Sequence, residues 1–184
     1  MKLLIGGDVV PKETNEKYFI EGDVKTLFGK TVDLAEKADR VIINLECALT
    51  SSEEKIKKIG PNLRADERCV NAVKKFGVTD AMLANNHAFD HGETAFLDTL
   101  DTLESAGMPY VGGGRDLEQA AAPVIMEKGG MKIGFLAATQ IERNPNPDTR
   151  SRWTRMASAT AVRSSTTPTS TKKTASSSPA HPDR

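Results

Sequence analysis

The chain has 184 residues, the length of a single domain, and its 25 Lys and Arg residues balance its 25 Asp and Glu residues. This balance excludes the strongly basic footprint of a nucleic-acid-binding protein, so we predict no nucleic-acid partner. No apolar run approaches the roughly 20 residues that a transmembrane helix needs. The apolar stretch near the amino terminus, Leu3–Ile5, is too short for a signal peptide. We therefore predict a cytoplasmic protein without a membrane segment.

The composition changes abruptly near Arg150. Residues 151–184 contain eight Ser, seven Thr and five Ala, but no Ile, Leu, Phe, Tyr or Gly. They carry six Lys and Arg against one Asp, a charge of +5, which leaves 19 basic and 24 acidic residues, or −5, in residues 1–150. Such a segment buries too little apolar area to offset the entropy of ordering. We predict a disordered tail over residues 143–184. It is either a natural flexible extension or, as we favour, the product of a reading-frame shift near Arg150.

Residues 1–142 alternate short apolar runs with amphipathic segments. Short, β-branched runs predict strands, apolar residues at helical spacing predict helices, and a glycine pair between two apolar runs predicts a hairpin. This alternation predicts an α/β fold with a mostly parallel sheet flanked by helices. In chain order the predicted elements are a strand at 2–5, a helix at 25–37, a strand at 41–43, a helix at 67–76, a strand at 81–84, a helix at 93–106, a strand at 110–111, and a hairpin formed by 124–127 and 132–137.

Polar side chains follow three of these strands at the point where each ends. The carboxyl ends of parallel strands meet at one edge of a sheet, where ligands bind. Carboxylate, amide and imidazole groups hold divalent ions, and a bound ion polarises a phosphoryl or carbonyl oxygen and activates water. A histidine that is not a ligand could protonate the leaving group. The residues are Asp8 after the first strand, Asn44 and Glu46 after the second, and Asn85, Asn86, His87 and Asp90 after the third.

Each of these residues also has a purely structural interpretation. Asp8 could cap a turn, Asn44 and Glu46 could be the outward polar positions of a strand, and the two asparagines could be turn residues. His87 alone would more often be a hydrogen-bonded structural residue. The coincidence of three strand ends, rather than any one residue, favours a site. We predict that His91 is an exposed loop residue.

Other features leave their alternatives open. Residues 112–114, three glycines, could let a phosphate approach the backbone or could form a tight turn. Lys55, Lys57 and Lys58 could contact an anionic polymer, although a solvated face is the interpretation that we favour. Thr139, Gln140 and Glu142 could extend the same sheet edge. Cys47 has no evident base partner, and we predict that it is a free thiol.

Three motifs resemble the bacterial capsule-synthesis protein family CapA, which is associated with poly-gamma-glutamate synthesis. They are Gly-Asp-Val at 7–9, Asn-Leu-Glu at 44–46 and Ala-Asn-Asn-His-Ala-Phe-Asp-His-Gly at 84–92. The resemblance runs from Lys2 to about Glu142. The family is similar to calcineurin-like metallophosphoesterases, which implies a four-layer α/β/β/α sandwich around a two-metal site. Residues 1–142 would be the N-terminal part of this domain.

The resemblance also implies a role for each residue of these motifs. Asp8, Glu46 and Asn86 would be ligands of one or two divalent ions: Mn, Mg, Zn or Fe. His87 would contact the phosphate and act as the acid, and Asp90 would hold His87 by a hydrogen bond. Asn44 and Asn85 would contact the substrate. The family's later histidine motifs are absent, because the only other histidines are His91 and His181.

These implications lead to a functional expectation. We expect a CapA-like protein of capsule or poly-gamma-glutamate biosynthesis with an incomplete, metal-dependent phosphoesterase-like site that is weakly active or inactive. Its substrate would be phosphorylated or related to polyglutamate or polysaccharide, and other capsule-synthesis proteins would be its partners. The alternatives are a non-catalytic binding component of a polymer-synthesis assembly and a non-functional truncated product.

Overall fold

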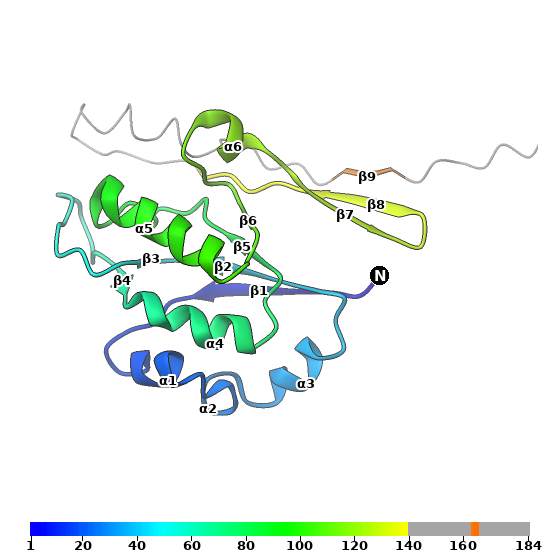
Figure 1. The fold of residues 1–184 in the computed structure, drawn as a ribbon, viewed down its shortest axis with the longest axis horizontal. Helices are drawn as coiled ribbons and strands as arrows, with labels where there is room; N and C mark the ends of the chain where they lie inside the picture. The colour runs from blue at the N-terminus through cyan, green and yellow to red at the C-terminus, as the bar shows by residue number, and fades with distance from the viewer. Residues whose placement is uncertain (140–162, 166–184) are drawn as a thin grey trace, which may run out of the picture.

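A parallel sheet of four strands forms the centre of the protein (Figure 1). The computed structural model describes residues 1–139 and 163–165. The sheet contains β1 (Leu3–Val9), β2 (Arg40–Leu45), β5 (Asp80–Met82) and β6 (Tyr110–Val111), in the spatial order β1-β2-β5-β6. All three pairings are parallel, so the predicted α/β class with a parallel sheet is confirmed.

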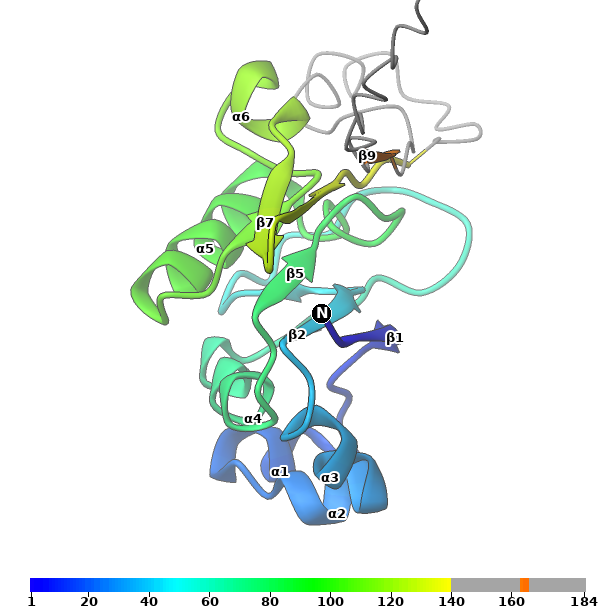
Figure 2. The same ribbon diagram turned by 90° about the vertical axis from the view of Figure 1, so that its right-hand side faces the viewer.

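Helices connect these strands. They are α1 (Glu16–Glu21), α2 (Val24–Phe28), the 3₁₀ turn η1 (Gly29–Thr31), α3 (Val32–Ala35), the 3₁₀ turn η2 (Glu67–Cys69), α4 (Val70–Lys75) and α5 (Gly92–Ser105). Figures 1 and 2 show α1 to α4 on one side of the sheet and a β-hairpin on the other. The strand order runs in one direction along the sheet. Right-handed crossovers that advance in one direction place their helices on the same face.

The main hydrophobic core lies between the sheet and these helices. Alternate residues of β2, Val41, Ile43 and Leu45, are buried in it together with Phe96 and Leu100 of α5. This alternation follows from the two-residue period of a strand. Because β2 is buried by neighbours on both sides, it holds the residues that follow it in a fixed position.

The hairpin covers part of the opposite face of the sheet. It consists of β7 (Val124–Lys128) and β8 (Met131–Phe135), and the short α6 (Leu117–Ala121) precedes it. Met126 of the hairpin and Ile42 of β2 are both buried. The edge strand β1 is less covered, and Ile5 is 60% exposed.

Several boundaries differ from the prediction. The helix predicted at 25–37 is broken into α2, η1 and α3, because Gly29 adopts a positive φ of 55°. β1 continues beyond residue 5, so Asp8 lies within the strand, and β5 ends at Met82 rather than Ala84. The elements that were not predicted are α1, α6, the strand β9 (Arg163–Ser165) described below, and the two-stranded parallel sheet of β3 (Ala48–Leu49) and β4 (Arg64–Ala65). The hairpin was predicted correctly.

Most of the predicted tail, residues 143–184, lies outside the described residues. The exception is β9 (Arg163–Ser165), which pairs with β8 in antiparallel orientation. Within the described ranges, no helix is long and apolar enough to cross a membrane.

Candidate functional site at the strand ends

The residues predicted to converge come from the carboxyl ends of three neighbouring strands. The pairing of β1 with β2 shifts its register between Ile5 and Asp8, and this irregularity sets Asp8 opposite Asn44. Glu46 follows β2 directly, and its backbone N–H donates to the Val9 carbonyl at 3.1 Å. A bulge next to a ligand site commonly re-aims a side chain in this way.

Two asparagines connect the three strand ends. The Asn44 side chain donates to Asp8 Oδ1 at 2.7 Å. Asn85 Nδ2 donates to Asn44 Oδ1 at 3.1 Å and to the Leu45 carbonyl at 2.9 Å, and Asn85 Oδ1 accepts from the His87 backbone N–H. Asn85 is buried. The asparagines therefore fix the positions of Asp8 and His87 relative to each other.

Asp8 and Glu46 form a pair of carboxyl groups at this edge. Burial, together with the hydrogen bond and the charge of Asp8, raises the pKa of the Glu46 carboxyl. Two carboxylates brought together repel each other, so the pair favours a shared proton or a bound cation. This is the electrostatic signature that we expect at the oxygen ligands of a divalent ion.

His87 faces the carboxyl pair on one side and Asp90 on the other. Its Nε2 lies 3.9 Å from Glu46 Oε1, and its Nδ1 lies 2.7 Å from Asp90 Oδ2. The buried Asp90 carboxylate accepts a hydrogen bond, so Nδ1 carries the proton in the neutral ring. The lone pair of Nε2 then points away from Asp90. The hydrogen bond between His87 and Asp90 that the resemblance implied is therefore present.

A loop whose lysines we expected to form a solvated face contacts His87 and Asp90. Residues 51–63, which we call the strap, connect β3 to β4. Lys58 Nζ forms an ion pair with Asp90 Oδ1 and lies 3.1 Å from His87 Nδ1. The prediction for Lys58 was therefore wrong, whereas Lys55 and Lys57 are exposed as expected. No local pattern marks Lys58, because its contacts lie about 30 residues away in sequence.

The prediction for His91 was also wrong. His91 is only 1% exposed, and neither ring nitrogen makes a hydrogen bond of good geometry within the described part of the chain. Burial lowers its pKa, and the charges of Arg64 and Lys55 act in the same direction, while Asp90 and the nearby Ser52 backbone oppose them. The residue is the N-cap of α5 and is buried rather than exposed in a loop.

Asn86 does not join the cluster. It is exposed, and among residues 1–139 its side chain makes none of the hydrogen bonds that link the other strand-end residues. In the same range, no three His, Cys, Asp or Glu side chains form a group with the spacing of a metal site. The donors at the edge thus fit a divalent ion in kind, through the Asp8 and Glu46 carboxyls, but the structure does not show a complete ligand set.

The secondary candidates have structural explanations. A Cβ atom at Gly112 would lie 2.7 Å from Ala84 Cβ and 2.8 Å from Ala137 Cβ, so glycine permits the close packing at this position. Its φ of 79° is also one that other residues rarely adopt. Cys47 is a buried free thiol, as predicted, and burial raises its pKa. Thr139 follows β8 in the described range, whereas Gln140 and Glu142 lie outside it.

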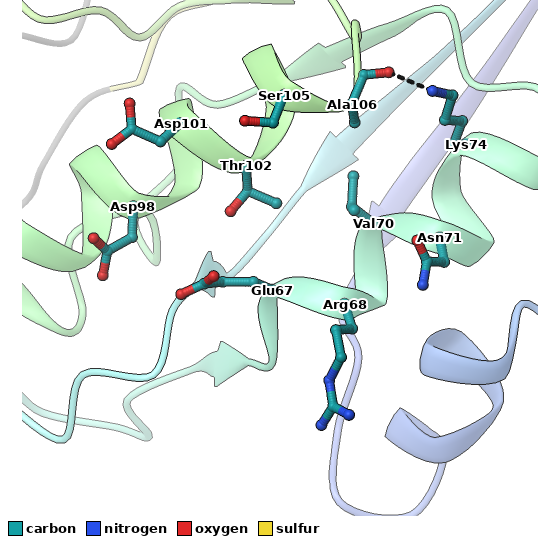
Figure 3. Close-up of a pocket in the computed structure, with 10 residues that line it drawn as sticks. All are labelled: Glu67, Arg68, Val70, Asn71, Lys74, Asp98, Asp101, Thr102, Ser105 and Ala106. Atoms are coloured by element: carbon teal, nitrogen blue, oxygen red, sulfur yellow. Dashed lines mark hydrogen bonds between the residues drawn. The ribbon is translucent and has the colours of Figure 1, made fainter.

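A surface groove elsewhere does not belong to this site. It has a volume of about 620 Å³, and Figure 3 shows it between α4 and α5. Its charged groups are largely engaged: Lys74 donates to the Ala106 carbonyl at 2.7 Å, Arg68 pairs with Asp66, and Asp101 pairs with Arg115. None of the strand-end residues lines it.

Comparisons with known proteins agree with the motifs at the strand ends. The family described as "Bacterial capsule synthesis protein PGA_cap" matches residues 2–180. This chain belongs to that family. The matched range extends past Glu142, to which we traced the resemblance.

A similar curated protein is the capsule biosynthesis protein CapA of Bacillus anthracis, which is 35% identical to this member of the family over 78 residues. The aligned segment covers 42% of this chain and 19% of the relative. The aligned part of the chain therefore spans about a fifth of the length of the curated relative.

Proposed function

We propose that this member of the capsule synthesis family acts in capsule polymer biosynthesis through a metal-dependent phosphoesterase-like site at its strand ends. The observation that carries the proposal is the carboxyl pair of Asp8 and Glu46, with the lone pair of His87 Nε2 facing it at 3.9 Å from Glu46. Such a site would take a phosphorylated or polyanionic precursor of the capsule polymer.

The residues of the site have separate tasks in this proposal. Asp8 and Glu46 would hold a divalent ion, which when bound supplies charge stabilisation to a phosphoryl oxygen and a more acidic water. Asn44 orients Asp8 through its hydrogen bond. His87, kept as the Nδ1–H tautomer by Asp90, presents Nε2 and in its protonated form gives a proton to the leaving oxygen.

Metal binding tests the carboxyl pair directly. Titration of the full chain with Mn²⁺ in a calorimeter should show binding that Asp8→Asn or Glu46→Gln weakens at least about tenfold, because each change removes a charged oxygen ligand. Glu36→Gln is the matched control. Glu36 follows α3 just before β2 begins, so it lies near the amino-terminal ends of the strands, opposite the candidate site. Replacing it should leave Mn²⁺ binding unchanged.

Hydrolysis of bis(p-nitrophenyl) phosphate with Mn²⁺ then tests the reaction. We expect turnover that depends on Mn²⁺ and is lost in His87→Gln. Equal Mn²⁺ affinity of the wild type and of both ligand variants would refute the metal site.

A binding role without catalysis is the second candidate. The exposed, unengaged Asn86 and the absence of a third acidic, His or Cys ligand in residues 1–139 favour it. In that case the edge would bind an anionic polymer segment through a resident ion. Mn²⁺ binding that depends on Asp8 and Glu46, without hydrolysis of the phosphodiester, would select this candidate over the first.

A further inference from the structure

The strap contacts the site through hydrogen bonds and an ion pair to Asp90. The strap binds the Asp90 backbone through Ile56 N–H at 3.0 Å and Asn62 Nδ2 at 2.7 Å, both donating to the Asp90 carbonyl. It also binds the side chain, since Leu63 N–H donates to Asp90 Oδ2 at 2.7 Å and Lys58 pairs with Oδ1. One buried residue thus receives four contacts from one loop.

Lys58 divides the two carboxylate oxygens of Asp90 between different partners. The Lys58 ammonium pairs with Oδ1, whereas Oδ2 accepts hydrogen bonds from His87 Nδ1–H and from Leu63 N–H. Asp90 is completely buried and the Lys58 side chain is 16% exposed. A carboxylate in such surroundings needs a charge partner, because isolated buried charges are strongly disfavoured.

The position of Lys58 relative to the imidazole ring limits its role. Lys58 Nζ lies beside Nδ1, whereas Nε2 faces Glu46 on the other side of the ring. Lys58 therefore does not face the position where the carboxyl pair would hold an ion. It acts on His87 only through Asp90 and by closing the strap over the Nδ1–H bond.

We infer that Lys58 is a positioning residue. Its ion pair with Asp90, which we call the lock, holds the strap against Asp90. The lock shields from water the hydrogen bond between His87 Nδ1 and Asp90, which orients His87 Nε2 toward the carboxyl pair. An effect of Lys58 on catalysis rests on the proposed function, whereas the ion pair between Lys58 and Asp90 does not. Lys57, the exposed neighbour of Lys58 on the same strap, has no such contact in the described residues.

Proton NMR of the ¹⁵N-labelled full chain tests the lock without any reaction. The Nδ1–H proton of His87 should give a downfield resonance that exchanges slowly with water and is absent in His87→Gln. Lys58→Met should raise its exchange rate at least tenfold, because the strap opens. Lys58→Arg should restore slow exchange, and Lys57→Met should leave the rate unchanged.

Lys58→Gln provides a second uncharged variant in case Lys58→Met does not fold, and the amide spectrum reports folding for both. A wild-type exchange rate in either folded variant would overturn the inference. Faster exchange accompanied by a wild-type amide spectrum outside the strap supports it.

Kinetics separate this inference from the proposed function. With bis(p-nitrophenyl) phosphate and Mn²⁺, Lys58→Met should lower kcat at least tenfold with little change in KM, because Lys58 lies away from the substrate side of the ring. Absence of hydrolysis by the wild type would refute the proposed reaction alone, and the exchange rates would still decide whether Lys58 locks the strap.

Discussion

Asn85 shows how much of the sheet edge depends on one buried amide. Its side chain joins β2 to the turn after β5 through three hydrogen bonds, to Asn44, to Leu45 and from His87. Removing a buried partner leaves the remaining groups unsatisfied and costs about 1–3 kcal/mol. The amide is therefore as much a structural component of the edge as a candidate substrate contact.

Replacing Asn85 should lower stability. We expect Asn85→Ala to reduce the free energy of unfolding by about 1–3 kcal/mol in urea titrations followed by circular dichroism. Asn86→Ala is the control, because the exposed neighbour should change stability by no more than about 0.5 kcal/mol. Equal stability of the two variants would contradict the role assigned to Asn85.

Glu46 should limit stability when no cation is bound. Because its pKa is raised in the folded protein, the folded state binds the Glu46 proton more tightly than the unfolded state, and this contribution to stability is lost as pH rises through the raised pKa. Glu46→Gln, which stays neutral at every pH, should therefore raise the melting temperature at pH 7.

The pH dependence provides the control for this prediction. Near pH 4, where the Glu46 carboxyl is protonated, the wild type and Glu46→Gln should melt at similar temperatures. A lower melting temperature of the variant at pH 7 would contradict the repulsion between the Asp8 and Glu46 carboxylates.

At the scale of elements, β1 is an exposed edge strand. Among the residues that the structure describes, it pairs with β2 on one side only, and its residue Ile5 is 60% exposed. Unpaired N–H and C=O groups beside an apolar side chain favour pairing with another chain. The register shift before Asp8 interrupts this edge, so the regular segment before it, which includes Ile5, is the region most open to association.

A charge at Ile5 should reduce self-association. We expect the wild type to form concentration-dependent oligomers in sedimentation velocity experiments, and Ile5→Lys to shift the distribution toward monomer, because edge lysines oppose strand pairing. Ile5→Val keeps the apolar edge and should behave like the wild type. Oligomers of unchanged size in Ile5→Lys would place the association elsewhere.

At the scale of the whole molecule, His91 should make the fold sensitive to mild acid. Its pKa is lowered below the ordinary value of 6.5, so the unfolded state binds its proton more readily. Stability is then lost as pH falls below about 6.5, since the buried ring must be charged or expelled. Lys55 and Arg64 add to this sensitivity, whereas Asp90 opposes it.

Thermal melts between pH 7 and pH 5 test the effect. The wild type should lose several degrees of melting temperature over this interval, and His91→Phe, which fills a similar buried volume without titrating, should lose less. His181→Phe, outside the described residues, is a control for histidine titration in general. Parallel losses in the wild type and His91→Phe would exclude His91 as the cause.

The sequence predicted the parts of the molecule that follow from local patterns. Asp8, Glu46 and His87 could be placed at one edge because each follows an apolar run, and strand ends of a parallel sheet must meet. The break at Gly29 does have a local signal, a glycine within a helical pattern, which the helix predicted at 25–37 does not take into account. Lys58 and His91 could not be placed, because the course of the strap depends on long-range contacts with Asp90 that have no periodic signal.

The strand order has a consequence for how the chain is made. Because β1, β2, β5 and β6 add to the sheet in the order in which they occur in the chain, each strand after β1 leaves the ribosome when its neighbour in the sheet has already been synthesised. None of these four strands must be inserted between two earlier ones. Synthesis proceeds from the amino terminus at about 5–20 residues per second. The carboxyl pair, the imidazole and Asp90 have all been made by residue 90, well before the hairpin appears, so the strand-end edge can form while the rest of the chain is still being translated.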